Sequence, residues 1–172
     1  MKNGVEREIP EEISGLGALK AYEKQFINGQ GKNTQRLKER QYNPARNKII
    51  DSIETAIKAT GLKDGMTISF HHHFRDGDYV VNMVLEEVAR MGVKDITICA
   101  SSLGSAHDPI ADLIESGVVT GIQSSGVRGK IGEAISRGKL EKLAIIRSHG
   151  GRVRAIEEGD VHIDIAFIGA PT

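Results

Sequence analysis

The sequence predicts a three-layer α/β/α fold built on a mostly parallel sheet, and three observations predict it. Short apolar runs recur between residues 66 and 168. A polar loop rich in Gly, Ser, His or Arg follows most of these runs, and segments with apolar residues at helical spacing separate them. Strands that alternate with helices are joined by right-handed crossovers and are covered on both faces.

The first elements follow from caps and turns. Asn43 followed by Pro44 is typical of a helix start, and apolar residues at helical spacing continue to Gly61, which predicts a helix over about 44–60. A strand at 66–70 and a histidine-rich loop come next. Asp78 is expected to cap a helix over 79–91 that ends before Gly92.

The same pattern then repeats along the chain. Asp108–Pro109 starts a helix that Gly117 closes, and a further helix is expected over 130–137 before Gly138. Further strands are predicted at 95–100, 118–122, 143–146 and 163–168.

The chain divides into an arm and a domain. Residues 1–43 show no sustained period and have several glycines, which indicates an N-terminal arm with one short helix near 17–26. Residues 44–172 form the α/β domain. Its last strand runs straight into the chain end, whereas a parallel strand ordinarily leads to another crossover, so we expect the domain to be truncated at its C-terminal end.

Composition narrows the class of protein. Lys plus Arg equals Asp plus Glu at 23 each and there is no Trp, which disfavours nucleic-acid and membrane partners. The charge is uneven, because residues 20–48 carry eight Lys or Arg against two Glu. The one cysteine, Cys99, lies in an apolar run and is expected to be a buried thiol. With no apolar stretch long enough for a membrane span and no apolar signal core, a cytoplasmic protein is expected.

Polar loops follow several of the expected strands. They lie at 71–78, 101–107, 123–129 and 148–152. Because the carboxyl ends of parallel strands meet at one edge of a sheet, we expect these loops to meet there and to form a pocket for an anion or a carbonyl group.

The histidine run leaves three interpretations open. His71 and His73 can converge, since alternate side chains of an extended chain share a face, and a third metal ligand would then have to come from His107, His149 or an Asp. The imidazoles can instead bond to loop carbonyls. They can also act as donors to a thioester oxygen or as cations beside a carboxylate. We predict no metal.

Other catalytic motifs are missing from the sequence. No serine lies in a Gly-x-Ser-x-Gly setting, and there is neither a Walker lysine loop nor a Gly-x-Gly-x-x-Gly after the first strand. Arg75 and Arg152 are the arginines that we expect to bind a carboxylate or phosphate, because the guanidinium fork matches both.

The loop sequences resemble the α subunits of bacterial citrate lyase. The resemblance rests on the run Ser69 to Val80 with its three histidines, together with Ser101-Ser102-Leu103-Gly104, Gly126-Val127-Arg128-Gly129 and Ser148-His149-Gly150-Gly151-Arg152. It extends to the arm through Asn43-Pro44-Ala45-Arg46. It implies a CoA-transferase-like domain and a citrate CoA-transferase subunit, which replaces acetyl by citryl on an acyl carrier protein and releases acetate. Known subunits are much longer, so this chain is similar to their N-terminal part.

The resemblance and the loops together suggest roles for individual residues. His71 and His73 are the candidate catalytic residues, as stabilisers of a thioester oxyanion, with no nucleophile assigned. The predicted substrate-binding residues are His72, Phe74, Arg75, Gly77, Ser148, His149, Gly150, Gly151 and Arg152. The predicted cofactor-binding residues are Ser101, Ser102, Gly104, Ser124, Ser125, Gly126 and Arg128. The Ser-Glu-Asn-Gly setting of the glutamate nucleophile in related CoA-transferases is absent here.

The resemblance also implies partners. No cofactor is expected to be bound permanently; the thioester belongs to the phosphoribosyl-dephospho-CoA arm of the carrier, or to CoA or acetyl-CoA. The expected partners are the citrate lyase β subunit, the γ acyl carrier protein, citrate, acetate and further copies of the chain. A non-catalytic ligand-binding domain of the sugar-phosphate isomerase or regulator type is the alternative, and a piece that docks the carrier through its basic arm is another.

Overall fold

The structure is a computed structural model, and it describes residues 2, 8, 10–14, 17–18, 49–71 and 79–169. It divides into two compact units, Met1–Arg36 and Leu37–Thr172. In the first unit, strands β1 (Glu12–Ile13) and β2 (Gly17–Ala18) pair antiparallel. The predicted helix near 17–26 is therefore wrong at its start, because Gly17 has a φ of 75° that a right-handed helix does not accommodate. Residues 19–26 lie outside the described part.

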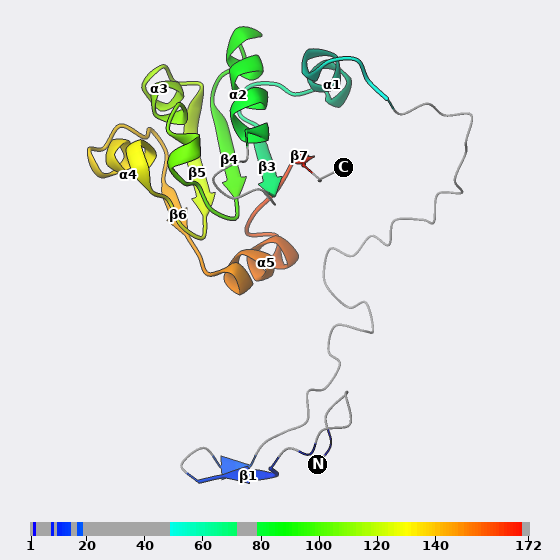
Figure 1. The fold of residues 1–172 in the computed structure, drawn as a ribbon, viewed down its shortest axis with the longest axis vertical. Coiled ribbons are helices and arrows are strands. Elements are labelled where there is room, and N and C mark those ends of the chain that lie inside the picture. Colours follow the sequence, from blue (N-terminus) through cyan, green and yellow to red (C-terminus); the bar gives the residue numbers. More distant parts are fainter. Residues whose placement is uncertain are drawn as a thin grey trace. The chain divides into compact units, whose positions relative to one another are not determined.

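The second unit contains the sheet. Its strands within residues 49–71 and 79–169 are β3 (Thr67–His71), β4 (Ile96–Ala100), β5 (Val119–Ser124), β6 (Ala144–Ile146) and β7 (Ile165–Ile168). All pair in parallel, in the order β6-β5-β4-β3-β7 (Figure 1). The predicted parallel α/β fold is confirmed.

One helix precedes the first strand of this sheet, and the others follow its strands along the chain. They are α1 (Ile53–Thr60), α2 (Val80–Arg90), α3 (Ile110–Glu115), α4 (Gly129–Ser136) and α5 (His149–Glu158), with a 3-10 turn, η2, at Ser105–His107. Within the described residues, no helix is long and apolar enough to cross a membrane.

The start of α1 differs from the prediction. Ser52 caps the helix by accepting a hydrogen bond from the Thr55 N–H, so the helix begins at Ile53. Ile49 is 81% exposed and Ile50 is 47% exposed, so the apolar period predicted across them does not continue into the core. The expected cap at Asn43–Pro44 and the Asp78 cap both lie outside the described residues.

The second difference is α5, which begins within the predicted 148–152 loop. Ser148 accepts a hydrogen bond from the Gly151 N–H at 3.0 Å and caps the helix. The pair Gly150–Gly151 disfavours helix and made this segment look like a loop. The Ser148 cap nevertheless starts a helix of ten residues, which ends before Gly159.

The two faces of the sheet are covered differently. On one face, Ile68, Phe70, Ile98 and Ile122 pack in the main core with residues of α2, α3 and α4. Cys99 points to the other face, where it packs with Ala155 of α5 and with Val161, and it is completely buried as predicted. This arrangement gives the expected three layers.

The connection through α5 creates a switch in topology. The chain leaves β3 in one direction through β4, β5 and β6 and returns through α5 to the other side of β3, as β7 (Figure 1). In open α/β sheets, ligands bind outside the carboxyl ends of the strands at such a reversal. His71 is the last residue of β3 and pairs with Ile168 of β7, so it lies at this position.

Candidate functional site

The predicted loops meet at one edge of the sheet. Parallel pairing places the carboxyl ends of β3, β4, β5 and β6 side by side, and the loops at 71, 101–107, 125–128 and 147–148 leave from those ends. The geometric expectation from the sequence is therefore confirmed for these residues. His72, His73, Phe74, Arg75 and Gly77 lie outside the described residues, so their roles stay predictions.

The loops after β4 and β5 are bound to each other. The Ser125 N–H donates to the Ser101 carbonyl at 3.1 Å, and the Leu103 N–H donates to the Gly126 carbonyl at 2.9 Å. Leu103 also bridges to Val127 and is 1% exposed. These contacts extend the pairing of β4 with β5 past the ends of the strands and hold both loops in fixed positions.

Several backbone donors of these loops already have partners. The Gly104 N–H donates to Nδ1 of the buried His107 at 3.1 Å, and the Gly126 N–H donates to Oγ of Ser124 at 3.2 Å. The Arg128 N–H donates to the Leu103 carbonyl at 3.0 Å. Oxyanion stabilisation by these particular N–H groups would need a rearrangement, so side chains are the better candidates for ligand donors. The assignment of Ser101, Ser102, Gly104, Ser124, Ser125, Gly126 and Arg128 to a cofactor stays a prediction.

Arg152 is the best-placed cation of the edge. It lies on α5, and its Nη2 donates to Oγ of Ser69 at 3.0 Å and to the Cys99 carbonyl at 3.3 Å. Its Nε atom is buried and makes no hydrogen bond. Ser148, His149, Gly150 and Gly151 form the cap and first turn beside it, so most of the predicted substrate-binding group of this segment surrounds one helix start.

Two side-chain pairings in this region did not follow from the sequence. Nη1 of Arg147 donates to Oε1 of Gln123 at 2.7 Å, which places a second guanidinium at the end of β6. Ser69, which is 7% exposed, anchors Arg152 from β3. A polar residue inside an apolar strand was the available signal for Ser69, and Gln123 near the end of β5 gave the same signal.

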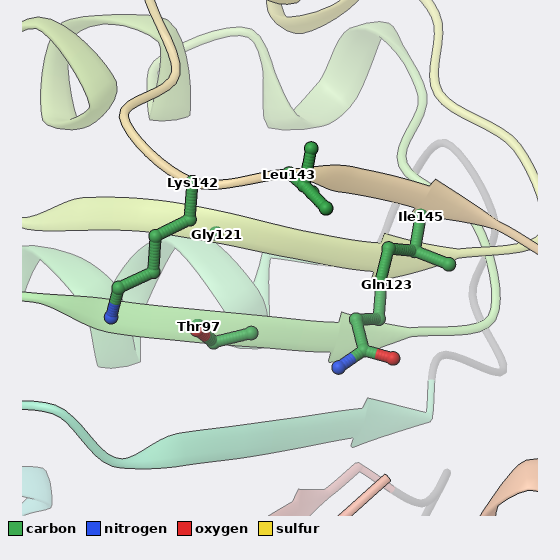
Figure 2. Close-up of a pocket in the computed structure, with 6 residues that line it drawn as sticks. All are labelled: Thr97, Gly121, Gln123, Lys142, Leu143 and Ile145. Atoms are coloured by element: carbon green, nitrogen blue, oxygen red, sulfur yellow. The ribbon is translucent and has the colours of Figure 1, made fainter. Parts of the chain in front are cut away.

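An open hollow lies on the α5 face of the sheet. It has a volume of about 400 Å³ and is lined by Thr97, Gly121, Gln123, Lys142, Leu143 and Ile145. Figure 2 shows Gln123 near the carboxyl ends of the strands and Lys142 at the opposite end. Gln123, whose amide oxygen accepts the hydrogen bond from Arg147, therefore forms part of the wall of the hollow.

The shifted carboxylate pKa values of the described residues lie away from these loops. At the amino edge, the Lys142 ammonium and then the Thr120 hydroxyl hold the pKa of Asp95 below its usual value. Lys58 and Arg90 lower the pKa of Glu54 on α1 in the same way. These ion pairs lie within α1 or join elements of the scaffold, and none of them is at the carboxyl edge.

A metal site was one open interpretation of the histidines. Within the described ranges, no three His, Cys, Asp or Glu side chains lie close enough together to hold a metal ion. Nδ1 of the buried His107 accepts a hydrogen bond from the Gly104 N–H within its own turn. His72 and His73 lie outside these ranges.

Comparison with known proteins identifies the family. The family model for the citrate lyase alpha subunit (CitF) matches residues 46–172. The citrate lyase alpha chain of Haemophilus influenzae is 55% identical over 124 residues, which are 72% of this chain and 25% of that one. The alpha chain of Klebsiella pneumoniae is also 55% identical over 124 residues, 72% of this chain and 24% of that one.

A solved structure agrees with these matches. It is a crystal structure, in complex with citrate, of a Streptococcus mutans protein assigned as the alpha subunit of citrate lyase. It is 60% identical, has a TM-score of 0.73, and the match covers 77% of this chain and 26% of that one. The chain spans about a quarter of the length of the curated relatives it matches. The resemblance read from the loop motifs is confirmed, and the chain belongs to the citrate lyase alpha subunit family.

Proposed function

We propose that this chain is part of a citrate CoA-transferase that exchanges acetyl for citryl on a carrier thioester. Acetyl-carrier and citrate react to give citryl-carrier and acetate. The observation that carries this proposal is the 60% identity to a relative crystallised with citrate. The curated relatives reported above are all citrate lyase alpha chains, and none is a sugar-phosphate isomerase or regulator.

The described edge suits the chemistry of such an exchange. A carboxylate oxygen must approach a thioester carbonyl, and negative charge develops on the carbonyl oxygen as it does so. Arg152 presents a guanidinium whose Nε–H has no hydrogen-bond partner, and its Nη2 is bonded to Ser69, two residues before His71 on β3. A charged donor of this kind is suited to a substrate carboxylate. Holding both reactants at one edge would supply much of the rate.

The partners and the thioester arm belong to the same proposal. The acyl group would be carried on the phosphoribosyl-dephospho-CoA arm of the γ acyl carrier protein, and the β subunit would cleave the citryl product. Ser101, Ser102, Ser124 and Ser125 are the candidates for contact with the arm, since their loops are held together at the same edge.

Thioester exchange tests the proposal. The complete polypeptide that contains these residues is mixed with acetyl-carrier and isotope-labelled citrate, and labelled citryl thioester is measured. We expect label in the carrier, and a loss of exchange when His71, His73 or Arg75 is changed to Ala. Arg154→Ala is the matched control, because Arg154 lies on α5 and pairs with the exposed Glu158. Absence of label with the unaltered protein would refute the proposal.

A further inference from the structure

The anchors of two guanidiniums lie in one row of residues across the sheet. Register pairs Ser69 with Cys99, and Cys99 with Gln123. Residues paired in register point to the same face, here the face on which α5 packs. Arg152 bonds to the first two positions of this row, and Arg147 bonds to the third.

The spacing of the anchors follows from the sheet. Neighbouring strands are about 4.8 Å apart, so the backbones of Cys99 and Gln123, which are paired in register, are separated by roughly one strand spacing. Both arginines come from the segment after β6, since Arg147 directly follows the strand and Arg152 lies in the first turn of α5. Two carboxyl groups on a short carbon skeleton are separated by a comparable distance.

Neither guanidinium is neutralised. Among the described residues, neither Arg147 nor Arg152 forms an ion pair, whereas Arg90, Arg137 and Arg154 each pair with a glutamate. Each of the two keeps N–H donors beyond those given to its anchors, and the Nε–H of Arg152 is buried without a partner. Partly buried guanidiniums held by neutral acceptors remain available for an anion.

We propose that Arg147 and Arg152 bind two different carboxylates of one substrate and thereby select polycarboxylates over monocarboxylates. Gln123 is a positioning residue, because its amide oxygen fixes the direction of the Arg147 guanidinium. This inference rests on the proposed function and names its substrate determinant. The open hollow that Gln123 lines would give room for the substrate skeleton on the side of the Arg147 anchor.

Removing one half of the pair should change selectivity and not only activity. In the complete polypeptide, Arg147→Gln is expected to raise KM for citrate about tenfold or more, with kcat within about threefold, because a charge-assisted hydrogen bond is lost from binding. Propane-1,2,3-tricarboxylate and acetate serve as competitive inhibitors of exchange. The preference for the tricarboxylate is expected to fall by a similar factor.

Two further variants separate binding from folding. Gln123→Met keeps the volume but removes the acceptor, and we expect a smaller rise in KM with a correspondingly smaller loss of selectivity. Arg154→Gln removes a cation from the same helix and is expected to leave both constants unchanged. Thermal unfolding of each variant is measured in parallel.

Several results would overturn the inference. An unchanged KM in Arg147→Gln would do so. An equal fall in the affinity for every ligand, together with a lowered Tm, would also do so. If the unaltered protein performs no exchange, the proposed function fails, but calorimetric titration with the tricarboxylate and with acetate still tests whether Arg147 and Arg152 bind two carboxylates of one ligand. In that case an unchanged preference for the tricarboxylate over acetate in Arg147→Gln would refute it.

Discussion

The contact between Gly121 and Thr97 gives a quantitative test of the sheet beneath the site. The two residues are paired across β5 and β4, where the register shifts between Ile96 and Thr97. A methyl group built on Gly121 would lie 2.7 Å from Oγ1 and 3.3 Å from Cγ2 of Thr97. Gly121→Ala therefore requires the Thr97 side chain or the strands to move.

The expected cost follows from two opposing effects. Overpacking of this kind costs about 1–3 kcal/mol. Replacing Gly by Ala also restricts the unfolded chain, which stabilises the fold by about 0.4–1 kcal/mol. We expect Gly121→Ala to lower the free energy of unfolding by about 1–2 kcal/mol, or the Tm by roughly 4 °C for each kcal/mol.

A double-mutant cycle in urea checks this reasoning. Thr97→Ala removes both contacting atoms, so Gly121→Ala made in that background should be neutral or stabilising by about 0.4–1 kcal/mol. The coupling between the two sites should be about 1–3 kcal/mol. An equal cost of Gly121→Ala in both backgrounds would show that Thr97 does not oppose Gly121, and the register of β4 against β5 would be wrong.

Three further predictions concern the scaffold, each measured by equilibrium unfolding. Phe70→Ala should cost about 3–5 kcal/mol, because Phe70 is 1% exposed and stacks on Phe167 with ring centroids 5.8 Å apart; a cost below 1 kcal/mol would contradict this packing. Ser148→Ala should cost about 1 kcal/mol through loss of the α5 cap, and Ser148→Asp should retain it. Because the pKa of Asp95 is lowered from 3.8 in the folded state, its stabilising effect is present above that pH and is lost as the pH falls below it. Asp95→Asn should flatten the fall of Tm in acid, and an unchanged profile would remove Asp95 from it.

The sequence predicted the sheet because its strands are short apolar runs, most of them followed by a polar loop. Periodicity also placed α2, α3 and α4 within a few residues of their observed bounds. From alternation alone it followed that the polar loops share one edge, which is the property on which the functional interpretation depends.

The errors have particular physical causes. At α5, two glycines concealed a helix that the Ser148 cap starts and that tertiary packing on Cys99 stabilises. At α1, the helix begins after a cap at Ser52, although the sequence predicted a helix that already included residues 49–52. Local pattern does not reveal which of several possible caps is used.

The local sequence pattern also could not predict which distant residues of the site bond to one another. The contact of Arg152 with Ser69 joins residues 83 positions apart, and that of Arg147 with Gln123 joins residues 24 apart. Both depend on the strand register and on the passage of α5 over one face, and neither property is written in a single stretch of sequence.

A crystal structure of the complete polypeptide with citrate would show where the substrate carboxylates bind. We predict a citrate carboxylate within hydrogen-bonding distance, about 2.7–3.2 Å, of the Arg152 guanidinium at the carboxyl ends of β3 and β4. Citrate bound only at the amino edge near Asp95, or on the face of the sheet covered by α2, α3 and α4, would contradict the placement of the substrate site.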